Sequence, residues 1–429
     1  MKNLYLLSII LFFFSFSNAQ IVDIPDARFK YALVYTNCVD TNGDGQGDSD
    51  GDINNDGEIQ VSEAEIIFWL DISYKDIDSL VGIQSFINLI TLICNNNEIS
   101  SIDLTSLSNL LELNCTANNI HSLDLTQNEN LHTLRCSSNY LNDLDITQNP
   151  NIVNLSFGIN SISSIDLTQN VDLEIINFGV NQINNLDITQ NSKLKVLVCQ
   201  YNNLSSINLT QNPLLEHIFI ENNNLTTIDV TQNPNLKWIN LKQNQLTQID
   251  VSQNLILEQL YCDSNHITNL DVSINENLLF LNCNENNLNN LNIRNGNNIN
   301  MLQMKAQNNP NLFCIQVDDE NFANNQICDL DPPYYGWCKD ETTSYSEDCA
   351  LGIDDITASN FKLFPNPVQD LLNIETQGQI EVLKIYNLQG QLIKADTERN
   401  IDVSQLNNGL YFIQITIDGK TVSKKFIKE

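Results

Sequence analysis

Residues 131–151 read LHTLRCSSNYLNDLDITQNPN, and the pattern in this segment specifies the fold. Its central asparagine recurs at a constant interval, without an insertion or a deletion, at Asn97, Asn118, Asn139, Asn160, Asn181, Asn202, Asn223, Asn244, Asn265 and Asn286. A period this strict is typical of stacked coils, because a single coil cannot bury its apolar face without its neighbours. The sequence therefore predicts a solenoid, an architecture whose long surface commonly binds a partner.

Apolar residues keep fixed distances from the repeated asparagine, which we call position N. Leucine or isoleucine stands at N-8 and N-5, an apolar residue at N-3, and further apolar residues at N+2, N+5 and N+7. The spacing Leu-x-x-Leu-x-Cys-x-x-Asn-x-Leu resembles the leucine-rich-repeat signature, in which a short strand ends at a corner. An asparagine amide can both donate to and accept from buried backbone groups at that corner, which leucine cannot do. We expect the strands to form one continuous parallel sheet.

The second half of each coil, commonly Leu-Asp-Leu-Thr-Gln-Asn, resembles the 21-residue bacterial class of leucine-rich repeat. The resemblance implies a β-rich solenoid with a short second strand or an irregular segment in each coil. Residues 89–312 fit the pattern as about eleven coils. At ~4.8 Å per strand these coils would make a rod roughly 50 Å long. In the last, imperfect coil we expect Gln307 at position N, beside Ile299, Leu302 and Met304.

Composition and the first residues limit the partners. The 429 residues carry 20 Lys+Arg and 53 Asp+Glu, a formal net charge of -33, so nucleic acid and anionic membranes are not expected partners. Residues 1–3 (MKN), an apolar run over 4–16 and SNA at 17–19 are typical of a signal peptide over residues 1–19. No later stretch is apolar for the ~20 residues that a spanning helix needs, so we expect no transmembrane span in the mature chain.

Residues 52–63 read DINNDGEIQVSE and match the twelve-residue EF-hand loop. Such a loop offers oxygens at positions 1, 3, 5, 7 and 9, a glycine at 6 and a bidentate glutamate at 12. The predicted ligands of a Ca²⁺ ion are therefore Asp52, Asn54, Asp56, Glu58, Gln60 and Glu63. Seven flexible oxygens suit Ca²⁺ better than the smaller Mg²⁺.

Just upstream, residues 40–48 repeat the first half of this loop, but Gly51 stands where the bidentate acid belongs. The candidate ligands of a weaker second site are Asp40, Asn42, Asp44 and Asp48. For both loops the alternative is a merely solvated acidic turn. Residues 24–29 (IPDARF), followed by such a loop, resemble the N-terminal cap of exported Bacteroidetes leucine-rich-repeat proteins. That resemblance implies a cap over residues 20–88 in which calcium is structural.

The eleven cysteines fall into three groups. Six lie at N-3, where we expect buried thiols in preference to disulfides or a metal site: Cys94, Cys115, Cys136, Cys199, Cys262 and Cys283. In-register side chains on parallel strands lie ~4.8 Å apart, farther than the ~3.5–4.5 Å between bridged Cβ atoms. Four more lie in residues 313–350, a predicted Cys-rich C-terminal cap, and favour two disulfides of undetermined pairing: Cys314, Cys328, Cys338 and Cys349. Cys38 is left over as a free thiol.

Residues 359–429, after a linker at 351–358, have a different rhythm. Alternating apolar residues predict strands at 371–374, 382–386, 391–394 and 410–417, and so a small β-sandwich. The segment resembles the type A C-terminal sorting domain of the Bacteroidetes type IX secretion system. The matching motifs are Pro365-Asn366-Pro367, Ile385-Tyr386-Asn387, Ile401-Asp402-Val403-Ser404, Gly409 with Tyr411, and Lys424-Lys425-Phe426-Ile427-Lys428. The resemblance implies export through the type IX machinery, then surface anchoring or release. An ordinary accessory β-sandwich is the alternative.

Positions N-6 and N-4 should point outward from the sheet. Large apolar and aromatic residues gather there in the later coils, with Tyr201 nearby at N-1: Ile175, Val196, Val198, Tyr201, His217, Phe219, Trp238, Tyr261, Phe280 and Met301. Exposed clusters of this kind anchor interfaces, so these are the candidate ligand-binding residues. The alternative is that they merely cover one another along the sheet.

Position N+6 forms an acidic column, interrupted by Asn208: Asp103, Asp124, Asp145, Asp166, Asp187, Asp229, Asp250 and Asp271. Carboxylates ~4.8 Å apart in water repel by ~0.9 kcal/mol per pair, so something must offset the repulsion. We expect the backbone amides of the following Thr-Gln turn to do so. A cation-binding stripe is the alternative.

No nucleophile motif, phosphate loop or histidine metal spacing is present in the sequence. We therefore predict a non-catalytic recognition or adhesion protein, secreted or anchored on the outer-membrane surface. It would bind a protein or glycan ligand through the exposed sheet face. A polysaccharide-acting enzyme and a purely structural surface component are the alternatives.

Overall fold

The computed structural model describes residues 20–328, 335–349, 361–376, 380–387, 391–417 and 420–429. The expected signal peptide and the linker at 351–358 lie outside the described residues. Two compact units are present. The first contains the described residues up to 291, with 295–312 and 326–340, and the second contains 292–294, 313–325 and those from 341 onward. None of the described helices is long and apolar enough to cross a membrane.

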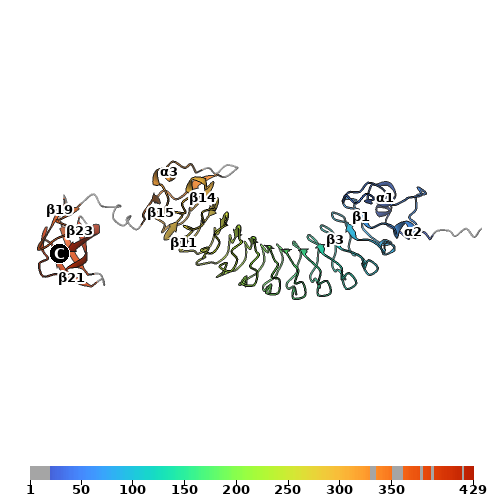
Figure 1. Ribbon diagram of the computed structural model, residues 1–429, viewed down its shortest axis with the longest axis horizontal. Coiled ribbons are helices and arrows are strands. Elements are labelled where there is room, and N and C mark those ends of the chain that lie inside the picture. Colours follow the sequence, from blue (N-terminus) through green and yellow to red (C-terminus); the bar gives the residue numbers. More distant parts are fainter. Residues whose placement is uncertain (1–19, 329–334, 350–360, 377–379, 388–390, 418–419) are drawn as a thin grey trace, which may run out of the picture. The chain divides into compact units, whose positions relative to one another are not determined.

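The first unit contains one parallel sheet of thirteen three-residue strands, which follow one another along the chain in Figure 1. They are β1 (Trp69–Asp71), β2 (Thr91–Ile93), β3 (Glu112–Asn114), β4 (Thr133–Arg135), β5 (Asn154–Ser156), β6 (Ile175–Asn177), β7 (Val196–Val198), β8 (His217–Phe219), β9 (Trp238–Asn240), β10 (Gln259–Tyr261), β12 (Phe280–Asn282), β14 (Gln303–Lys305) and β16 (Gly336–Cys338). Thr91 is in register with Glu112, and Glu112 with Thr133, so equivalent residues of successive coils lie side by side. The predicted continuous sheet is confirmed, and it begins at β1, ahead of residue 89.

The repeated asparagine joins neighbouring coils at the corner that follows each strand. Asn181 is 9% exposed, and its Nδ2 donates to the carbonyl oxygens of Phe178 (3.0 Å) and Phe157 (3.1 Å), at N-3 of its own and of the preceding coil. Its Oδ1 accepts from the backbone N–H of Ile162, also in the preceding coil (3.0 Å). The expected double role as donor and acceptor is therefore confirmed.

A second asparagine ladder, which we did not predict, runs along another edge of the coils. Its members are fully buried: Asn128, Asn149, Asn170, Asn191, Asn212, Asn233, Asn254 and Asn275. The Nδ2 of Asn170 donates to the carbonyl oxygen of Asn149, one coil earlier, at 2.8 Å, and the other members repeat the contact. The signal was in the sequence, because these asparagines keep the period of the first ladder at position N+10.

The last coil corrects one prediction. Asn309, and not Gln307, occupies the corner: its Nδ2 donates to the carbonyl oxygens of Cys283 and Ala306, and its Oδ1 accepts from the N–H of Leu288. The interval from Asn286 to Asn309 is longer than the earlier ones, and the strand moves with it, so β14 spans Gln303–Lys305. As a result Met301 takes an inward position and is only 4% exposed.

Short helices cover the first coil. Helix α1 (Ala27–Tyr35) begins at Asp26, whose Oδ1 accepts from the N–H groups of Arg28 and Phe29. The Oδ2 of Asp26 accepts from Asp78 and Ser79 (2.9 Å each), which ties the helix to the turn after β1. Two other elements of this region are α2 (Val61–Ala64) and the 3₁₀ turn η1 (Ile83–Ser85).

The later coils contain the 3₁₀ turn η2 (Asn298–Asn300), and strands β11 (Asn269–Asp271) and β13 (Asn290–Asn292) on their second segments. At the end of the large sheet, the Nε1–H of buried Trp337 in β16 donates to the carbonyl oxygen of Met301 (3.1 Å). A disulfide joins Cys328 to Cys338.

The second unit contains helix α3 (Glu320–Asn324), which lies in the sequence between strands β15 (Cys314–Gln316) and β17 (Ser344–Ser346). The two strands pair in parallel. A disulfide joins Cys314 to Cys349. The prediction of two bridges is confirmed.

The C-terminal segment contains two antiparallel sheets. One has the order β18 (Phe361–Phe364), β19 (Leu371–Thr376) and β22 (Asn400–Asp402). The other has the order β21 (Leu392–Asp396), β20 (Ile380–Tyr386), β23 (Gly409–Ile417) and β24 (Lys420–Lys428). Both contribute to one buried core, which includes Ile374, Leu383 and Phe426. The predicted sandwich is confirmed, with three further strands: β18, β22 and β24.

Candidate ligand-binding face and calcium loops

The outward positions of the sheet are where the sequence places them. In most strands the middle residue is buried and its two neighbours are half-buried, as in β8, where Ile218 lies between His217 and Phe219. Of the ten predicted ligand-binding residues, Ile175 and Tyr201 are exposed (41% and 55%) and seven are half-buried. Met301 does not belong to this face, because the register change in the last coil buries it.

Four rings form a continuous aromatic cluster: His217, Phe219, Trp238 and Tyr261. The ring of Trp238 lies 4.8 Å from that of Phe219, 6.5 Å from that of His217 and 6.2 Å from that of Tyr261, measured between centroids. The Phe219 and His217 contacts are edge-to-face, a favoured geometry of aromatic pairs. These rings therefore do cover one another, and together they form an apolar surface over three coils.

The corner residues at N-1 all adopt a left-handed backbone, with φ between 52° and 60°. Asparagine, which tolerates this conformation best, occupies three of these corners (Asn96, Asn222 and Asn308), whereas three consecutive coils place Ile159, Val180 and Tyr201 there. These three side chains are 56%, 44% and 55% exposed. We call them the corner column. A left-handed backbone costs a residue with a Cβ about 1–2 kcal/mol, and these exposed side chains recover little of it by burial.

Beside the corner column, glycine occupies N-2. A Cβ on Gly179 would lie 2.6 Å from the side chain of Gln200, and a Cβ on Gly158 would lie 2.9 Å from the carbonyl oxygen of Gly179. In these two coils glycine therefore makes room for the side chain or the backbone of the next coil, and the third coil has Gln200 at N-2. Ile159, Val180 and these glycines were not among our predicted site residues, although a tabulation of position N-1 would have revealed the apolar run.

The residues of the predicted calcium loop are held by the loop's own amides. Asp52, which is 3% exposed, accepts from the N–H groups of Asp56 (3.1 Å) and Gly57 (2.8 Å). Glu63, which is 6% exposed, accepts from the N–H groups of Asn54 (3.1 Å) and Gln60 (2.9 Å). Two buried carboxylates thus lie in one short loop. No ion pair compensates either of them in the part of the chain that the structure describes.

The donor set fits a hard cation only in part. The side-chain amide of Gln60 spans the loop, accepting from Asn54 Nδ2 (2.7 Å) and donating to Asp56 (3.0 Å). Glu58 pairs through its side chain with Lys30 (2.6 Å), which leaves only its carbonyl for a metal. Across the described ranges no three His, Cys, Asp or Glu side chains by themselves surround a metal position. A calcium site here would therefore depend on Asn54, Gln60 and the carbonyl of Glu58 as well as on carboxylates.

The second loop repeats the hydrogen bonds of the first. Asp40 accepts from the N–H of Gly45 (2.7 Å), as Asp52 does from Gly57, and Asn42 accepts from Asp44 (2.8 Å), as Asn54 does from Asp56. Although desolvation alone would raise it, the backbone N–H groups of Gly45, Gly43 and Asn42 donate to the Asp40 carboxylate and lower its pKa. The carboxylate of Asp48 accepts from the backbone N–H and the hydroxyl of Thr41.

The acidic column has the arrangement that we expected. The Oδ1 of Asp145 accepts from the N–H (2.9 Å) and the hydroxyl (2.7 Å) of Thr147, and these bonds lower the pKa of Asp145. Asn208 makes the same two bonds to Thr210, so the turn does not require a charge. The column is therefore a set of capped turns.

The seven cysteines outside the disulfides are buried thiols, and the expected buried ladder at N-3 is confirmed. Burial raises the pKa of Cys38 to about 12, and it raises the pKa of Cys94 and of Cys136 well above the usual thiol value. Such thiols are poor nucleophiles and poor metal ligands.

Comparison with protein families supports the export of the chain. Residues 362–429 match the family model "Secretion system C-terminal sorting domain". The sorting domain indicates type IX export followed by surface attachment or secretion. One curated protein, beta-agarase D of Zobellia galactanivorans, is 38% identical over 69 residues, which cover 15% of this chain and 14% of that protein. The chain thus spans about a seventh of that relative's length, so the match says nothing about agarase activity here.

Solved structures support the fold. The functional domain of InlJ from Listeria monocytogenes, described as including a cysteine ladder, has a TM-score of 0.54 and 20% identity, and the alignment covers 96% of this chain and 98% of that one. The internalin InlF from the same species has a TM-score of 0.50 and 20% identity, over 68% of this chain and 94% of the other. At this identity the likeness shows the fold alone: a leucine-rich-repeat solenoid with a parallel sheet.

Proposed function

We propose that this chain is a non-catalytic recognition protein, displayed on or released from the cell surface, that binds a protein or glycan ligand through its sheet face. The observation that carries the proposal is the corner column of Ile159, Val180 and Tyr201. Backbone strain that the fold does not need is commonly found at functional sites. The same corner is built elsewhere in this chain with asparagine, which adopts the left-handed region at less cost. An exposed, strained apolar column beside an aromatic cluster supports a ligand-binding role.

The corner column can be tested because stability and binding should change in opposite directions. In the triple variant Ile159→Asn, Val180→Asn and Tyr201→Asn, we expect the free energy of unfolding to rise by up to about 1 kcal/mol per site, because strain is relieved. We expect ligand capture from a panel of immobilised proteins and polysaccharides to fall at least tenfold, because the apolar contact is lost. Both quantities are measured on the same preparation, by denaturant titration and surface plasmon resonance.

Ala117→Asn provides the matched control, because Ala117 occupies the same corner in an early coil. This control should leave ligand capture unchanged. Undiminished capture by the triple variant would show that the corner column does not contact the ligand, and would count against the proposal.

We further propose that Ca²⁺ binds the loop at residues 52–63 and stabilises the N-terminal segment without taking part in any chemistry. Asp52, Asn54, Asp56, Gln60 and Glu63 would supply side-chain oxygens, and Glu58 would supply its carbonyl. The two buried carboxylates, Asp52 and Glu63, support this proposal because a divalent cation would offset the cost of burying them. The loop at residues 40–48 is the weaker candidate.

Addition of calcium should therefore raise the stability of the first compact unit, which contains the loop. At ten to a hundred times Kd the expected gain is roughly 1.4–2.7 kcal/mol, since an ion that binds only the folded state stabilises it by mass action. Thermal unfolding with calcium or with chelator measures the gain. Glu63→Gln should abolish the response, whereas Glu58→Gln should retain it, because Glu58 offers only its backbone carbonyl. Identical melting curves with and without calcium would refute a structural ion.

A further inference from the structure

Next to the aromatic cluster, the outward position N-2 carries Gln200 and then three charged side chains in consecutive coils: Glu221, Lys242 and Asp263. The four coils before them have Thr116, Ser137, Gly158 and Gly179 at this position. Asp263 is only 5% exposed and Glu221 is half-buried. Charged side chains have therefore been placed on the face of the sheet at the coils that carry the aromatic rings.

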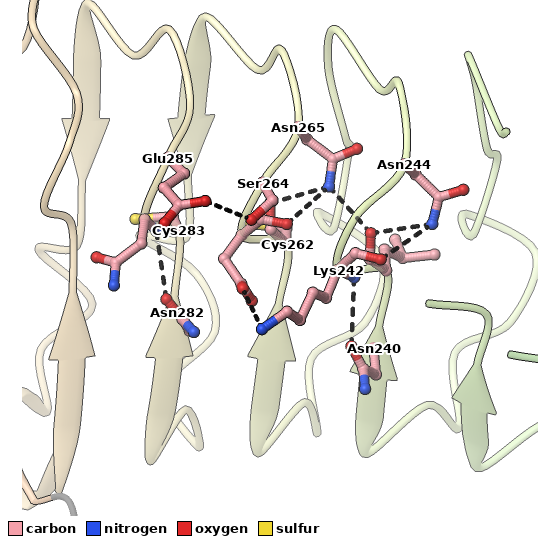
Figure 2. Close-up of polar contacts among 12 residues, drawn as sticks. Asn240, Lys242, Asn244, Cys262, Ser264, Asn265, Asn282, Cys283 and Glu285 are labelled. Carbon is pink, nitrogen blue, oxygen red and sulfur yellow. Dashed lines mark hydrogen bonds and ion pairs between the residues drawn. The ribbon is translucent and has the colours of Figure 1, made fainter. Parts of the chain in front are cut away.

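The hydrogen bonds of this group are incomplete in the described structure. Figure 2 shows Lys242 extending toward the next coil, where its Nζ lies 3.2 Å from Oδ2 of Asp263. Asp263 Oδ1, Glu221 Oε2 and Gln200 Oε1 are buried and accept no hydrogen bond from the described residues. In the same area the Nε1–H of Trp238 and the Nδ1 of His217 are buried without a partner among those residues. Unpaired acceptors therefore outnumber unpaired donors, and a ligand rich in donors would complete the group.

The group also has more negative than positive charge. Among the described residues, Lys242 is the one basic side chain that interacts with both Glu221 and Asp263, and Glu285 adds a third carboxylate near Asp263. Burial raises the pKa of Glu221 and of Asp263, and Lys242 offsets only part of that shift. A buried carboxylate is costly unless it is paired. One ammonium among three carboxylates leaves room for another positive charge.

The aromatic rings supply a second attraction for a cation. Phe219 and Tyr261 precede Glu221 and Asp263 by two residues on the same face of their strands, and the ring of Trp238 lies between those of Phe219 and Tyr261. A guanidinium group within about 6 Å of a ring is attracted by its electron-rich face. Arginine also carries five N–H donors in a planar fork, which suits several unpaired acceptors better than a lysine ammonium does.

We propose that Glu221, Asp263 and Lys242, together with the rings of Phe219, Trp238 and Tyr261, form a subsite for an arginine side chain of a basic protein segment. The subsite rests on the proposed recognition function of the sheet face and identifies the ligand as a protein. The excess acid of the chain would speed the approach of such a segment, since long-range attraction raises association rates. A neutral glycan would leave the extra negative charge unpaired.

The experiment measures binding of two probe peptides to the full chain by isothermal titration calorimetry. Both are nine-residue Gly/Ser peptides, one with two arginines and the other with two citrullines, which keep the shape of arginine but lack the charge. The double variant Glu221→Gln/Asp263→Asn should weaken binding of the arginine peptide at least tenfold. The control Asp124→Asn/Asp145→Asn removes the same two charges from the exposed acidic column and should leave the affinity within a factor of two. Citrulline should bind at least tenfold more weakly than arginine.

Lowering the pH should weaken binding of the arginine peptide before the chain unfolds, because carboxyl groups with raised pKa values take up protons first. An equal loss of affinity in both double variants would show a general effect of charge and would overturn the subsite. Failure of the arginine peptide to bind would overturn it as well. If a neutral oligosaccharide such as cellohexaose binds instead, and Trp238→Ala abolishes that binding, the arginine subsite fails while recognition through the face stands.

Discussion

Asn181→Ala should lower the free energy of unfolding by about 3 kcal/mol, the largest loss that we expect from a single polar substitution in the solenoid. The side chain is 9% exposed and makes three hydrogen bonds to the backbone, two as donor and one as acceptor. Removing it leaves the N–H of Ile162 without its acceptor, and a buried unpaired group costs about 1–3 kcal/mol. Denaturant titration followed by circular dichroism measures the loss. Asn185→Ala, an exposed position in the same coil, should change stability by less than about 0.5 kcal/mol.

The same contact predicts that neighbouring substitutions are not additive. The carbonyl oxygen of Phe178 accepts from Asn181 (3.0 Å) and from Asn202 (3.1 Å). Either asparagine alone keeps that oxygen paired, so replacing both with alanine should cost more than the sum of the single losses. Alanine at Asn118 and Asn244, which share no partner, should give additive losses. Additivity in both pairs would show that the ladder does not couple adjacent coils.

Deleting residues 359–429 should abolish surface display and leave the protein in the periplasm. The reason is that residues 362–429 match the sorting domain and contain their own hydrophobic core, whereas the strands of the large sheet all lie before them. Protease accessibility on intact cells and fractionation measure the change, which should approach complete loss from the surface. Circular dichroism of the purified deletion variant checks that its solenoid still folds.

Phe426→Ala offers a finer version of the deletion experiment. Phe426 is fully buried in the sandwich, where its ring stacks on that of Tyr411 at 5.6 Å between centroids. Truncating a buried phenylalanine costs about 3–5 kcal/mol, which is enough to unfold a small domain. This variant should be retained in the periplasm like the deletion, whereas Phe412→Ala, at a 41% exposed position, should be displayed normally. Normal display of the deleted chain would refute the sorting assignment.

The repeat could be predicted from the sequence because every coil has the same residue types at the same positions. An asparagine at the same position of every coil, with leucine at fixed distances from it, leaves a single way to stack the strands in register. The two disulfides could be expected but not paired, because four cysteines allow three pairings and the sequence contains no distances. The prediction of Gln307 at position N was wrong because extra residues in the last coil break the period and shift the strand. Only the hydrogen bonds of Asn309 show where the corner lies.

The candidate site was predicted less completely than the fold. Eight of the ten proposed residues lie on the strand face, since side chains alternate along a strand, and Tyr201 lies at the adjoining corner. Ile159 and Val180 were missed because an exposed apolar residue is ordinary until its backbone is known to be left-handed. Glu221 and Asp263 were missed because a charged residue on a solenoid surface is ordinarily solvated, and their burial is seen only in the folded chain.

The order of residues along the chain is enough to specify the architecture: a parallel solenoid, a separate sandwich, a buried thiol ladder and two cross-linked cysteine pairs. These follow from local spacing and from the burial that each residue type requires, which every coil repeats. Only the tertiary structure shows which surface groups are strained, buried or unpaired. These properties depend on contacts between side chains of successive coils, and those side chains meet only when the coils stack. The candidate binding site of this protein lies in those contacts between coils.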